Sequence, residues 1–345
     1  LEAHNLSVNI YTSPHLINFN ERIRIKGDLI SDEMLIEILN EIEIKNNKKP
    51  ITFFEITTAA ALISFFRNPS DVNIIETGLG GRLDATNIID NKRICLITKI
   101  GYDHTEFLGK TIQSIAYEKA GILRKDVPVI IAKQDNLKAY KTLQDLVSKI
   151  DSRIIDTVTL SDDFTLGLKG DHQYENASTA YTAASTIITK ISESKTILGL
   201  SKTLWHGRIE EIKSGNIIKY RNNITILDGA HNIDGAIVIR KYFQTQSTPK
   251  WNLIIGMLNN RDIKQFVSKF KNYINVAYTI PIKNQKSSSH PNKLALELND
   301  LGLKSYPTLS LEHALNKTNK DTPLLITGSL YLAGEVLEFN KTIIK

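Results

Sequence analysis

Short apolar runs alternate with longer amphipathic stretches along almost the whole chain, and this alternation most constrains its fold. The runs are of strand length, whereas the longer stretches carry apolar residues at helical spacing. Strands that alternate with helices predict an α/β protein with largely parallel sheets. The expected strands are residues 8–11, 72–75, 94–97, 127–131, 224–227, 253–255, 276–280 and 324–326, and the expected helices are residues 32–44, 54–66, 111–123, 139–149, 175–188, 233–243 and 263–270.

The length of the chain predicts two domains. A chain of 345 residues is long for one core and sufficient for two. A polar stretch at residues 192–195, with Gly199 and Gly207 after it, indicates a boundary between residues 187 and 208. We therefore predict one α/β domain over residues 1–200 and a second over 201–345, with the active site in the cleft between them.

Charge and cysteine content narrow the class of protein. The net charge is +6, but the lysines are scattered and often paired with acids, which does not favour a nucleic-acid partner. No apolar stretch approaches the roughly 20 residues of a membrane helix, and the first 15 residues do not resemble a signal peptide. The single cysteine, Cys95, lies in an apolar run, which predicts a buried thiol in a reducing compartment. We therefore expect a cytoplasmic protein without a membrane partner.

Residues 76–87 (E-T-G-L-G-G-R-L-D-A-T-N) follow the apolar run 72–75, which we interpret as a buried strand. A carboxylate at a strand end, such as Glu76, can bind Mg²⁺. The glycines permit close backbone approach to a ligand, although a lone G-x-G-G is more typical of a tight turn. The stretch lacks the G-x-G-x-x-G spacing of a nicotinamide-dependent dehydrogenase.

Lys119 stands out by its position in the expected helix 111–123. The apolar residues Ile112, Ile115 and Ala116 place position 119 on the same, buried face. A buried ammonium without a partner is costly. The side chain therefore either extends to water or is paired or modified.

Several segments, in order along the chain, together resemble folylpolyglutamate synthase and dihydrofolate synthase, which belong to the Mur ligase superfamily. The resemblance runs from residue 11 to about residue 335. It implies an N-terminal Mur-type mononucleotide-binding α/β domain and a smaller C-terminal Rossmann-like α/β domain. The matching segments are 11–16 (Y-T-S-P-H-L), 21–25 (E-R-I-R-I), 52–55 (T-F-F-E), 76–87, 101–109 (G-Y-D-H-T-E-F-L-G), 118–122 (E-K-A-G-I), 170–177 (G-D-H-Q-Y-E-N-A), 205–210 (W-H-G-R-I-E), 228–232 (D-G-A-H-N) and 256–262 (G-M-L-N-N-R-D).

The resemblance also implies a magnesium site and catalytic residues. It assigns Ser13, Glu76 and His104 to the metal, and it assigns Asp103, His104 and Lys119 to catalysis, with Lys119 carbamylated. Imidazole is an unusual ligand for magnesium, so the metal role of His104 rests on the resemblance alone. A potassium ion is a further implied cofactor.

The substrate residues are implied in the same way. Arginine suits the phosphate-binding position, because its planar fork pairs two phosphate oxygens. Three positions depart from the family pattern, namely His206, Asn260 and Arg261. The implied folate-binding residues are Thr52, Phe53, Phe54, Leu83 and Asp84, and the implied ATP-binding residues are Asn176, Arg208, Asp228 and His231.

The family's reaction joins L-glutamate to a folate or to dihydropteroate, with ATP forming an acyl phosphate first. We expect a monomer. The G-x-x-x-x-G-K-[ST] phosphate loop, which relatives carry upstream of the segment matching 11–16, does not occur in these 345 residues. We therefore expect the first domain to lack its first strand and this loop, and residues 1–6 to be the tail of the helix that follows the loop.

Three readings of the function remain open at this point. The chain is a fragment of an active synthase, or it is a truncated remnant that binds folate or a partner with little turnover. The third reading is a Mur-type peptide ligase of cell-wall synthesis, which shares the architecture and the lysine but not segments 11–16 and 52–55.

Overall fold

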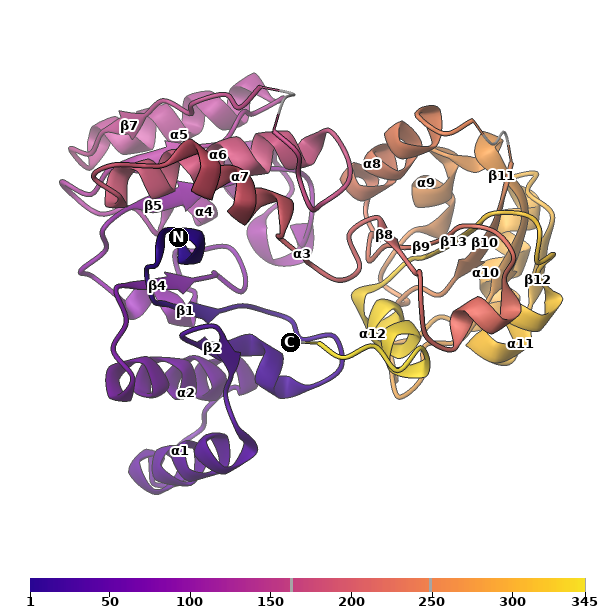
Figure 1. Cartoon of the computed structure of the whole chain (residues 1–345), viewed down its shortest axis with the longest axis horizontal. Coiled ribbons are helices and arrows are strands. Elements are labelled where there is room, and N and C mark those ends of the chain that lie inside the picture. The colour runs from indigo at the N-terminus through magenta and orange to yellow at the C-terminus, as the bar shows by residue number, and fades with distance from the viewer. Residues whose placement is uncertain (162–163, 248–249, 345) are drawn as a thin grey trace. The chain divides into compact units, whose positions relative to one another are not determined.

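The computed structural model describes residues 1–161, 164–247 and 250–344, which form two compact units (Figure 1). Unit 1 comprises Leu1–Gly167 and Gln173–Thr203, and unit 2 comprises Leu168–His172 and Leu204–Ile344. The main division between the units lies after Thr203, and the short segment Leu168–His172 belongs to unit 2. The polar stretch 192–195 contains the start of the helix α7 (Glu193–Ser201), which Ser192 caps.

The first sheet of unit 1 has four strands in the order β3-β2-β1-β4. β1 and β4 are parallel, whereas β2 pairs antiparallel with both β1 and β3. The helices α1 and α2 pack with this sheet around a core that includes Tyr11, Ile38 and Phe65. The bounds are β1 Val8–Tyr11, β2 Ile23–Ile25, β3 Asp28–Leu29, α1 Asp32–Asn46, α2 Phe53–Arg67 and β4 Val72–Ile75.

The interpretation of residues 72–75 as a buried strand is wrong. Ile74 is 44% exposed, and Val72 and Ile75 are only partly buried. The reason is that β4 lies at the edge of its sheet and pairs with β1 on one side. An apolar run therefore identified the strand correctly but not its place in the sheet.

The second sheet of unit 1 consists of β5, β6 and β7, all parallel. The apolar faces of α4 and α5 form its core together with the strand residues, among them the buried free thiol Cys95. The chain begins with a 3-10 helix (Glu2–His4), not the α-helical tail that was expected. The bounds are β5 Cys95–Ile97, α3 Thr105–Leu108, α4 Ile112–Ala120, β6 Val129–Ile131, α5 Leu137–Lys149, β7 Ile154–Ile155 and α6 His172–Ile187.

Unit 2 is built on one six-stranded sheet in the order β12-β11-β10-β13-β9-β8. Its strands are parallel except for β8, which pairs antiparallel with β9. An aromatic cluster lies in its core, where the rings of Phe243 and Trp251 are 5.1 Å apart. The bounds are β8 Glu210–Glu211, β9 Thr225–Leu227, α8 Ile233–Gln244, β10 Trp251–Ile255, α9 Ile263–Ser268, β11 Ile274–Thr279, α10 Pro291–Asp300, β12 Ser305–Pro307, α11 Leu311–Lys317, β13 Leu324–Thr327 and α12 Leu330–Phe339.

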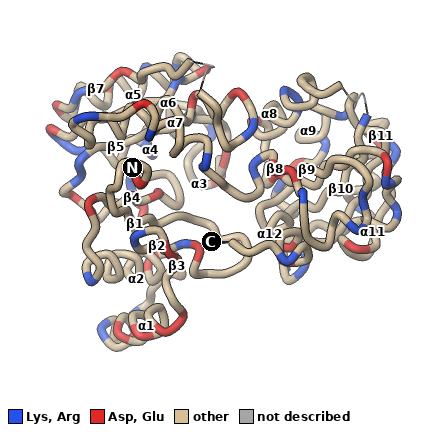
Figure 2. The backbone as a smooth tube through the Cα atoms, viewed as in Figure 1, with Lys and Arg blue, Asp and Glu red and all other residues tan. Residues whose placement is uncertain are grey.

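Basic and acidic residues are interspersed along the elements of each unit (Figure 2). Some form exposed ion pairs, such as Arg67 with Glu37 at 3.2 Å. Within the described ranges, no helix has both the length and the apolar character required to cross a membrane.

Candidate active site

Ser13 and Glu76 meet where two parallel strands end. β1 and β4 pair in register, with Tyr11 opposite Ile75, so the residues that follow both strands emerge at the same edge. The backbone N–H of Ser13 donates to the Glu76 carboxylate at 2.8 Å, and the N–H of Glu76 donates to the carbonyl of Tyr11 at 2.9 Å. The Glu76 side chain is exposed. The structure thus brings together two of the three predicted metal-binding residues at a carboxyl edge, where α/β proteins bind ligands.

Asp103 and His104 lie just before the short helix α3. His104 has a left-handed backbone (φ 50°), and its N–H donates to the Asp103 carboxylate at 2.9 Å. The imidazole Nε2 lies 4.0 Å from the same carboxylate, and the side chain is 43% exposed. Asp103 therefore fixes the turn that presents the histidine ring.

Lys119 lies on the buried side of α4, as its spacing predicts. Ile112, Ile115 and Ala116 are buried, and Lys119 itself is half-buried. Burial lowers the pKa of the Lys119 amine, and the nearby Asp103 carboxylate opposes that shift. Among the residues that the structure describes, no hydrogen bond or ion pair reaches this amine.

The donor set fits a magnesium ion in part. A carboxylate and a hydroxyl oxygen, as in Glu76 and Ser13, are ligands that Mg²⁺ accepts together with several waters. The described part of the chain contains no group of three or more His, Cys, Asp or Glu side chains placed to hold a metal ion. Glu76 and His104 are thus not members of such a group.

Phe54, one of the predicted folate-binding residues, lies against the glycine-rich loop. The ring of Phe54 lies against Gly78, where a Cβ would come within 2.3 Å of the ring, and 6.0 Å from the Tyr11 ring. Gly78 is required by this close approach. Thr52 caps α2, because its hydroxyl accepts the N–H of Glu55.

Phe53 has different neighbours from Phe54. Its ring is 61% exposed, lies 5.9 Å from the Phe19 ring, and is covered by the guanidinium of Arg22 at 5.4 Å. It also lines a cavity of about 650 Å³ beside α1 and α2. The structure therefore separates Phe53 from Phe54, although they are adjacent in sequence.

Leu83 and Asp84 lie in the loop after β4 and differ in what they can contact. Leu83 is 80% exposed. The carboxylate of Asp84 accepts the N–H groups of Leu79 and Thr86 and the Thr86 hydroxyl at 2.6 to 3.0 Å. Asp84 therefore shapes the loop, whereas Leu83 is available to a ligand.

In unit 2, three of the predicted ATP-binding residues (Arg208, Asp228 and His231) lie around two neighbouring glycines, Gly207 and Gly229. Asp228 follows β9 and is 6% exposed, and its two carboxylate oxygens accept the N–H groups of Ile209 and Ala230, each at 2.8 Å. A guanidinium nitrogen of Arg208 lies 3.3 Å from the position of a Cβ on Gly229. Burial raises the pKa of Asp228, and the backbone hydrogen bonds from Ile209 and Ala230 and the charge of Arg208 oppose this shift.

Asn176 lies on the exposed side of α6, and its amide donates to the side chain of Gln173 at 3.0 Å. His206 stands where the family pattern has proline. Its Nδ1 lies 2.8 Å from Glu210, whose other oxygen accepts the N–H of Gly207 at 2.9 Å. The departure at position 206 is therefore accommodated by a local carboxylate.

Sequence reasoning missed one set of residues near Lys119. Arg82 pairs with Glu118 at 3.0 Å, and Asn87 contacts the end of α4 through Gly121. Asn87 ends the segment 76–87, but no pattern in the sequence says which distant backbone it touches.

Known proteins resemble the chain over nearly its whole length. The dihydrofolate synthase/folylpolyglutamate synthase of Buchnera aphidicola (Acyrthosiphon pisum) is 33% identical over 96% of this chain and 82% of its own. The chain belongs to this synthase family. No protein-family model matches it.

Solved structures of the synthase family share the fold. Escherichia coli FolC in complex with DHPP and ADP is 27% identical, covers 98% of this chain and 82% of its own, and superposes with a TM-score of 0.85. The bifunctional synthase of Yersinia pestis, complexed with AMPPNP and a Mn ion, has the same TM-score at 24% identity, covering 98% of this chain and 83% of its own, and supports the fold. The two-domain α/β architecture expected from the sequence is confirmed.

Proposed function

We propose that the chain is an ATP-dependent ligase that adds L-glutamate to a folate, to dihydropteroate, or to both. The observation that carries the proposal is the meeting of Ser13 and Glu76 at the carboxyl edge of β1 and β4. Membership of the synthase family and the ADP and DHPP bound by its Escherichia coli relative support the choice of substrates.

Glu76 and Ser13 would hold a magnesium ion, with His104 as the third residue implied by the resemblance. A bound magnesium ion neutralises phosphate charge during transfer to the substrate carboxylate. Glu76 supplies the negative charge that such an ion requires, and the N–H of Ser13 orients its carboxylate. The implied potassium ion is part of the proposal without assigned residues.

Lys119 is proposed to be carbamylated. In this reaction the neutral amine nitrogen bonds to the carbon of CO₂, and one proton leaves to solvent. The lowered pKa of the buried amine favours the neutral, reactive form. The product is an anion, which is compatible with a neighbouring cation.

The ATP-binding role is assigned to the residues that the resemblance implies. Arg208 is proposed to pair with phosphate oxygens, since the guanidinium fork matches their geometry. Asp228 holds the two backbone segments around Gly207 and Gly229 through its hydrogen bonds, so we assign it and His231 to nucleotide positioning. Asn176 is assigned to ATP from the resemblance.

The acceptor is proposed to contact Phe54 and Leu83, with Thr52, Phe53 and Asp84 as the remaining implied residues. The exposed Leu83 supplies an apolar surface for a flat ring. The acceptor carboxylate takes the γ-phosphoryl group of ATP, and the glutamate amine then displaces phosphate from the acyl phosphate. The protein contributes mainly positioning and charge stabilisation, and we propose that it acts as a monomer.

The test is incorporation of labelled L-glutamate by the purified protein, with ATP and either dihydropteroate or tetrahydrofolate. We expect one amide product and one ADP for each glutamate incorporated. A UDP-linked cell-wall precursor is the competing acceptor. Glutamate transfer to that precursor instead of a folate, or ATP hydrolysis without amide formation, would contradict the proposal.

A further inference from the structure

The loop after β4 lies directly on the part of α4 that carries Lys119. A Cβ on Gly81 would come within 2.8 Å of the carbonyl oxygen of Lys119, and one on Gly121 would come within 2.3 Å of the Cα of Arg82. The N–H of Arg82 donates to the carbonyl of Glu118 at 2.8 Å. The contact is therefore backbone to backbone, and two glycines make it possible.

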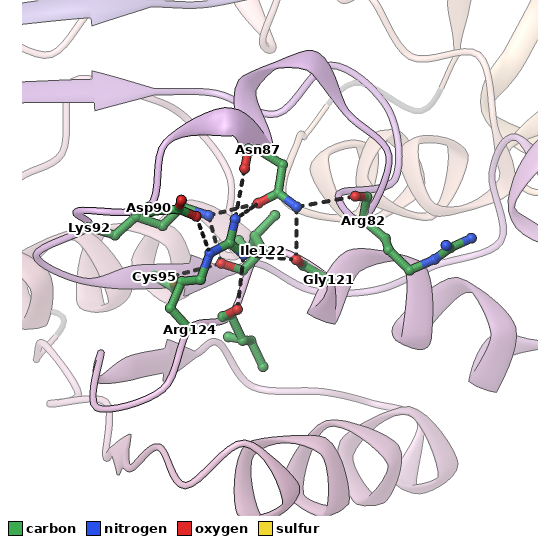
Figure 3. A network of polar contacts seen from close by, with 9 residues as sticks. Arg82, Asn87, Asp90, Lys92, Cys95, Gly121, Ile122 and Arg124 are labelled. Carbon is green, nitrogen blue, oxygen red and sulfur yellow. Dashed lines mark hydrogen bonds and ion pairs between the residues drawn. The ribbon is translucent and has the colours of Figure 1, made fainter.

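Asn87 connects the end of this loop to the end of the helix (Figure 3). Its amide nitrogen donates to the carbonyls of Gly121 at 3.0 Å and Arg82 at 3.2 Å. Its amide oxygen accepts from the Lys92 amine at 2.8 Å and from the Arg124 guanidinium at 3.1 Å. Both hydrogens and both lone pairs of the amide are thus used.

Two cations complete the contact at the C-terminal end of α4. Arg124 donates to the carbonyls of Gly121 at 3.3 Å and Asn87 at 2.7 Å, and its Nε donates to the Asp90 carboxylate at 3.0 Å. Lys92 donates to the carbonyl of Ile122 at 2.8 Å. Carbonyls at a helix end lack donors within the helix, and positive charge is favourable there.

This arrangement matters for Lys119 because the described residues offer its amine no hydrogen bond or ion pair. The place of the amine is therefore set by the backbone of α4. That backbone is held on both sides of Lys119, through Glu118 before it and through Gly121 and Ile122 after it.

We propose that Asn87, supported by Arg124, is a positioning residue that holds the loop carrying Leu83 and the helix segment carrying Lys119 in one fixed arrangement. The inference rests on the proposed function, in which Leu83 contacts the acceptor and Lys119 serves the metal site. Neither Asn87 nor Arg124 touches substrate in this account.

The decisive variant is Asn87→Asp. It keeps an oxygen for Lys92 and Arg124, but it loses both donated bonds and places a carboxylate oxygen against two carbonyls. The matched control is Asn91→Asp, which makes the same chemical change at a nearby exposed position. Arg124→Lys is the second variant, because it keeps the charge at the helix end and loses the fork.

The first measurement follows acetylation of Lys119 by peptide mass spectrometry in carbonate-free buffer, where the amine is unmodified, with Lys110 as internal reference. The loss of two hydrogen bonds raises the equilibrium constant for local opening of the loop and helix end by about tenfold. We therefore expect Lys119 to be acetylated about tenfold faster in Asn87→Asp and at the wild-type rate in Asn91→Asp. This result does not depend on catalysis.

The second measurement separates kcat from KM in the glutamate-ligation assay. We expect Asn87→Asp to lower kcat by about tenfold or more through misplacement, with the KM for ATP unchanged. Arg124→Lys should also raise the acetylation rate of Lys119 and lower kcat, but by smaller factors. Wild-type Lys119 reactivity in a folded Asn87→Asp or Arg124→Lys protein would overturn the inference. If the wild-type protein ligates no glutamate, the proposed function fails, and acetylation alone still decides the positioning role.

Discussion

Glu76 and Asp228 are both carboxylates that directly follow a parallel strand, yet the structure gives them different environments. Glu76 follows the edge strand β4 and is exposed, with the N–H of Ser13 on one oxygen. Asp228 follows β9, which lies between β13 and β8 in the six-stranded sheet, and it is almost fully buried with both oxygens bound to backbone N–H groups. The same position at a strand end is therefore exposed in one sheet, where we propose that it binds a cation, and buried in the other, where it holds the backbone.

The two units also hold buried titratable groups of opposite charge. Burial raises the pKa of Asp228 in unit 2 and lowers the pKa of Lys119 in unit 1, so burial disfavours the charged form at both places. Removing either charge should change stability in a pH-dependent way, whereas removing the exposed charge of Glu76 should change activity alone.

The largest effect is expected for Glu76→Gln. The amide keeps an acceptor for the N–H of Ser13 but removes the charge, so glutamate ligation should fall by about 100-fold or more. The unfolding free energy should change by less than about 0.5 kcal/mol, since the side chain is exposed. Steady-state kinetics and urea unfolding measure the two. Glu33→Gln, an exposed change in α1, is the control and should leave both as in the wild type.

Asp228→Asn should give the opposite pattern, a loss of stability in unit 2. The amide places an NH2 group, which cannot accept, against the N–H of Ile209 or Ala230, where a neutral carboxyl still has an oxygen, and one buried donor without a partner costs about 1–3 kcal/mol. Because the folded pKa of Asp228 is raised, the stability contributed by its neutral form is full below about pH 3.9 and declines as pH rises through the folded value. The difference in unfolding free energy between the wild type and Asp228→Asn should therefore become smaller as pH rises.

Tryptophan fluorescence during urea unfolding measures this effect, because both tryptophans, Trp205 and Trp251, belong to unit 2. A gap that widens with rising pH would mean that the native site favours the charged carboxylate, contrary to the role that burial gives it here.

The smallest effect is expected for Lys119→Met, which should stabilise unit 1 by about 1 kcal/mol by removing a partly buried polar group. Because the folded pKa is lowered, this gain is full at pH values below the folded value and disappears above about pH 10.4, where the amine is neutral in both states.

Hydrogen exchange of α4 peptides during urea unfolding, in carbonate-free buffer, measures the gain. Lys141→Met, at an exposed position in α5, is the control and should show no pH-dependent gain. If Lys119 is carbamylated as proposed, added bicarbonate should change the stability of the wild type and leave Lys119→Met unchanged. An equal response of both proteins would contradict the modification.

Much of the fold was predictable because buried strands and helix faces leave a periodic pattern. Every expected strand is present, for example at Val8–Tyr11 and Leu324–Thr327, and each expected helix lies within a few residues of its observed bounds. The helices α3, α7, α10, α11 and α12 were not predicted. The last two begin at the caps Ser310 and Ser329, so a signal for them was present. The two-residue strands β3, β7 and β8 are too short to show a period.

The candidate site was predictable only as separate segments. Spacing placed Lys119 on the buried face of α4, and the carboxylate at position 76 was expected at a strand end. The hydrogen bond from Asn87 to Gly121 joins residues more than thirty positions apart, and the one from Arg124 to Gly121 depends on a turn. No local pattern in the sequence therefore reveals either bond.

The sequence by itself determined the α/β class, the order of most elements, the family and the candidate residues, because these depend on local periodicity and on segments of recognisable type. Tertiary structure alone decided that Phe53 and Phe54 diverge and that β4 is an edge strand. It also decided that Glu76 is exposed while Asp228 is buried. The physical reason is that exposure and hydrogen-bond partners depend on which distant backbone packs against a residue, and long-range packing is not encoded in the spacing of neighbouring residues.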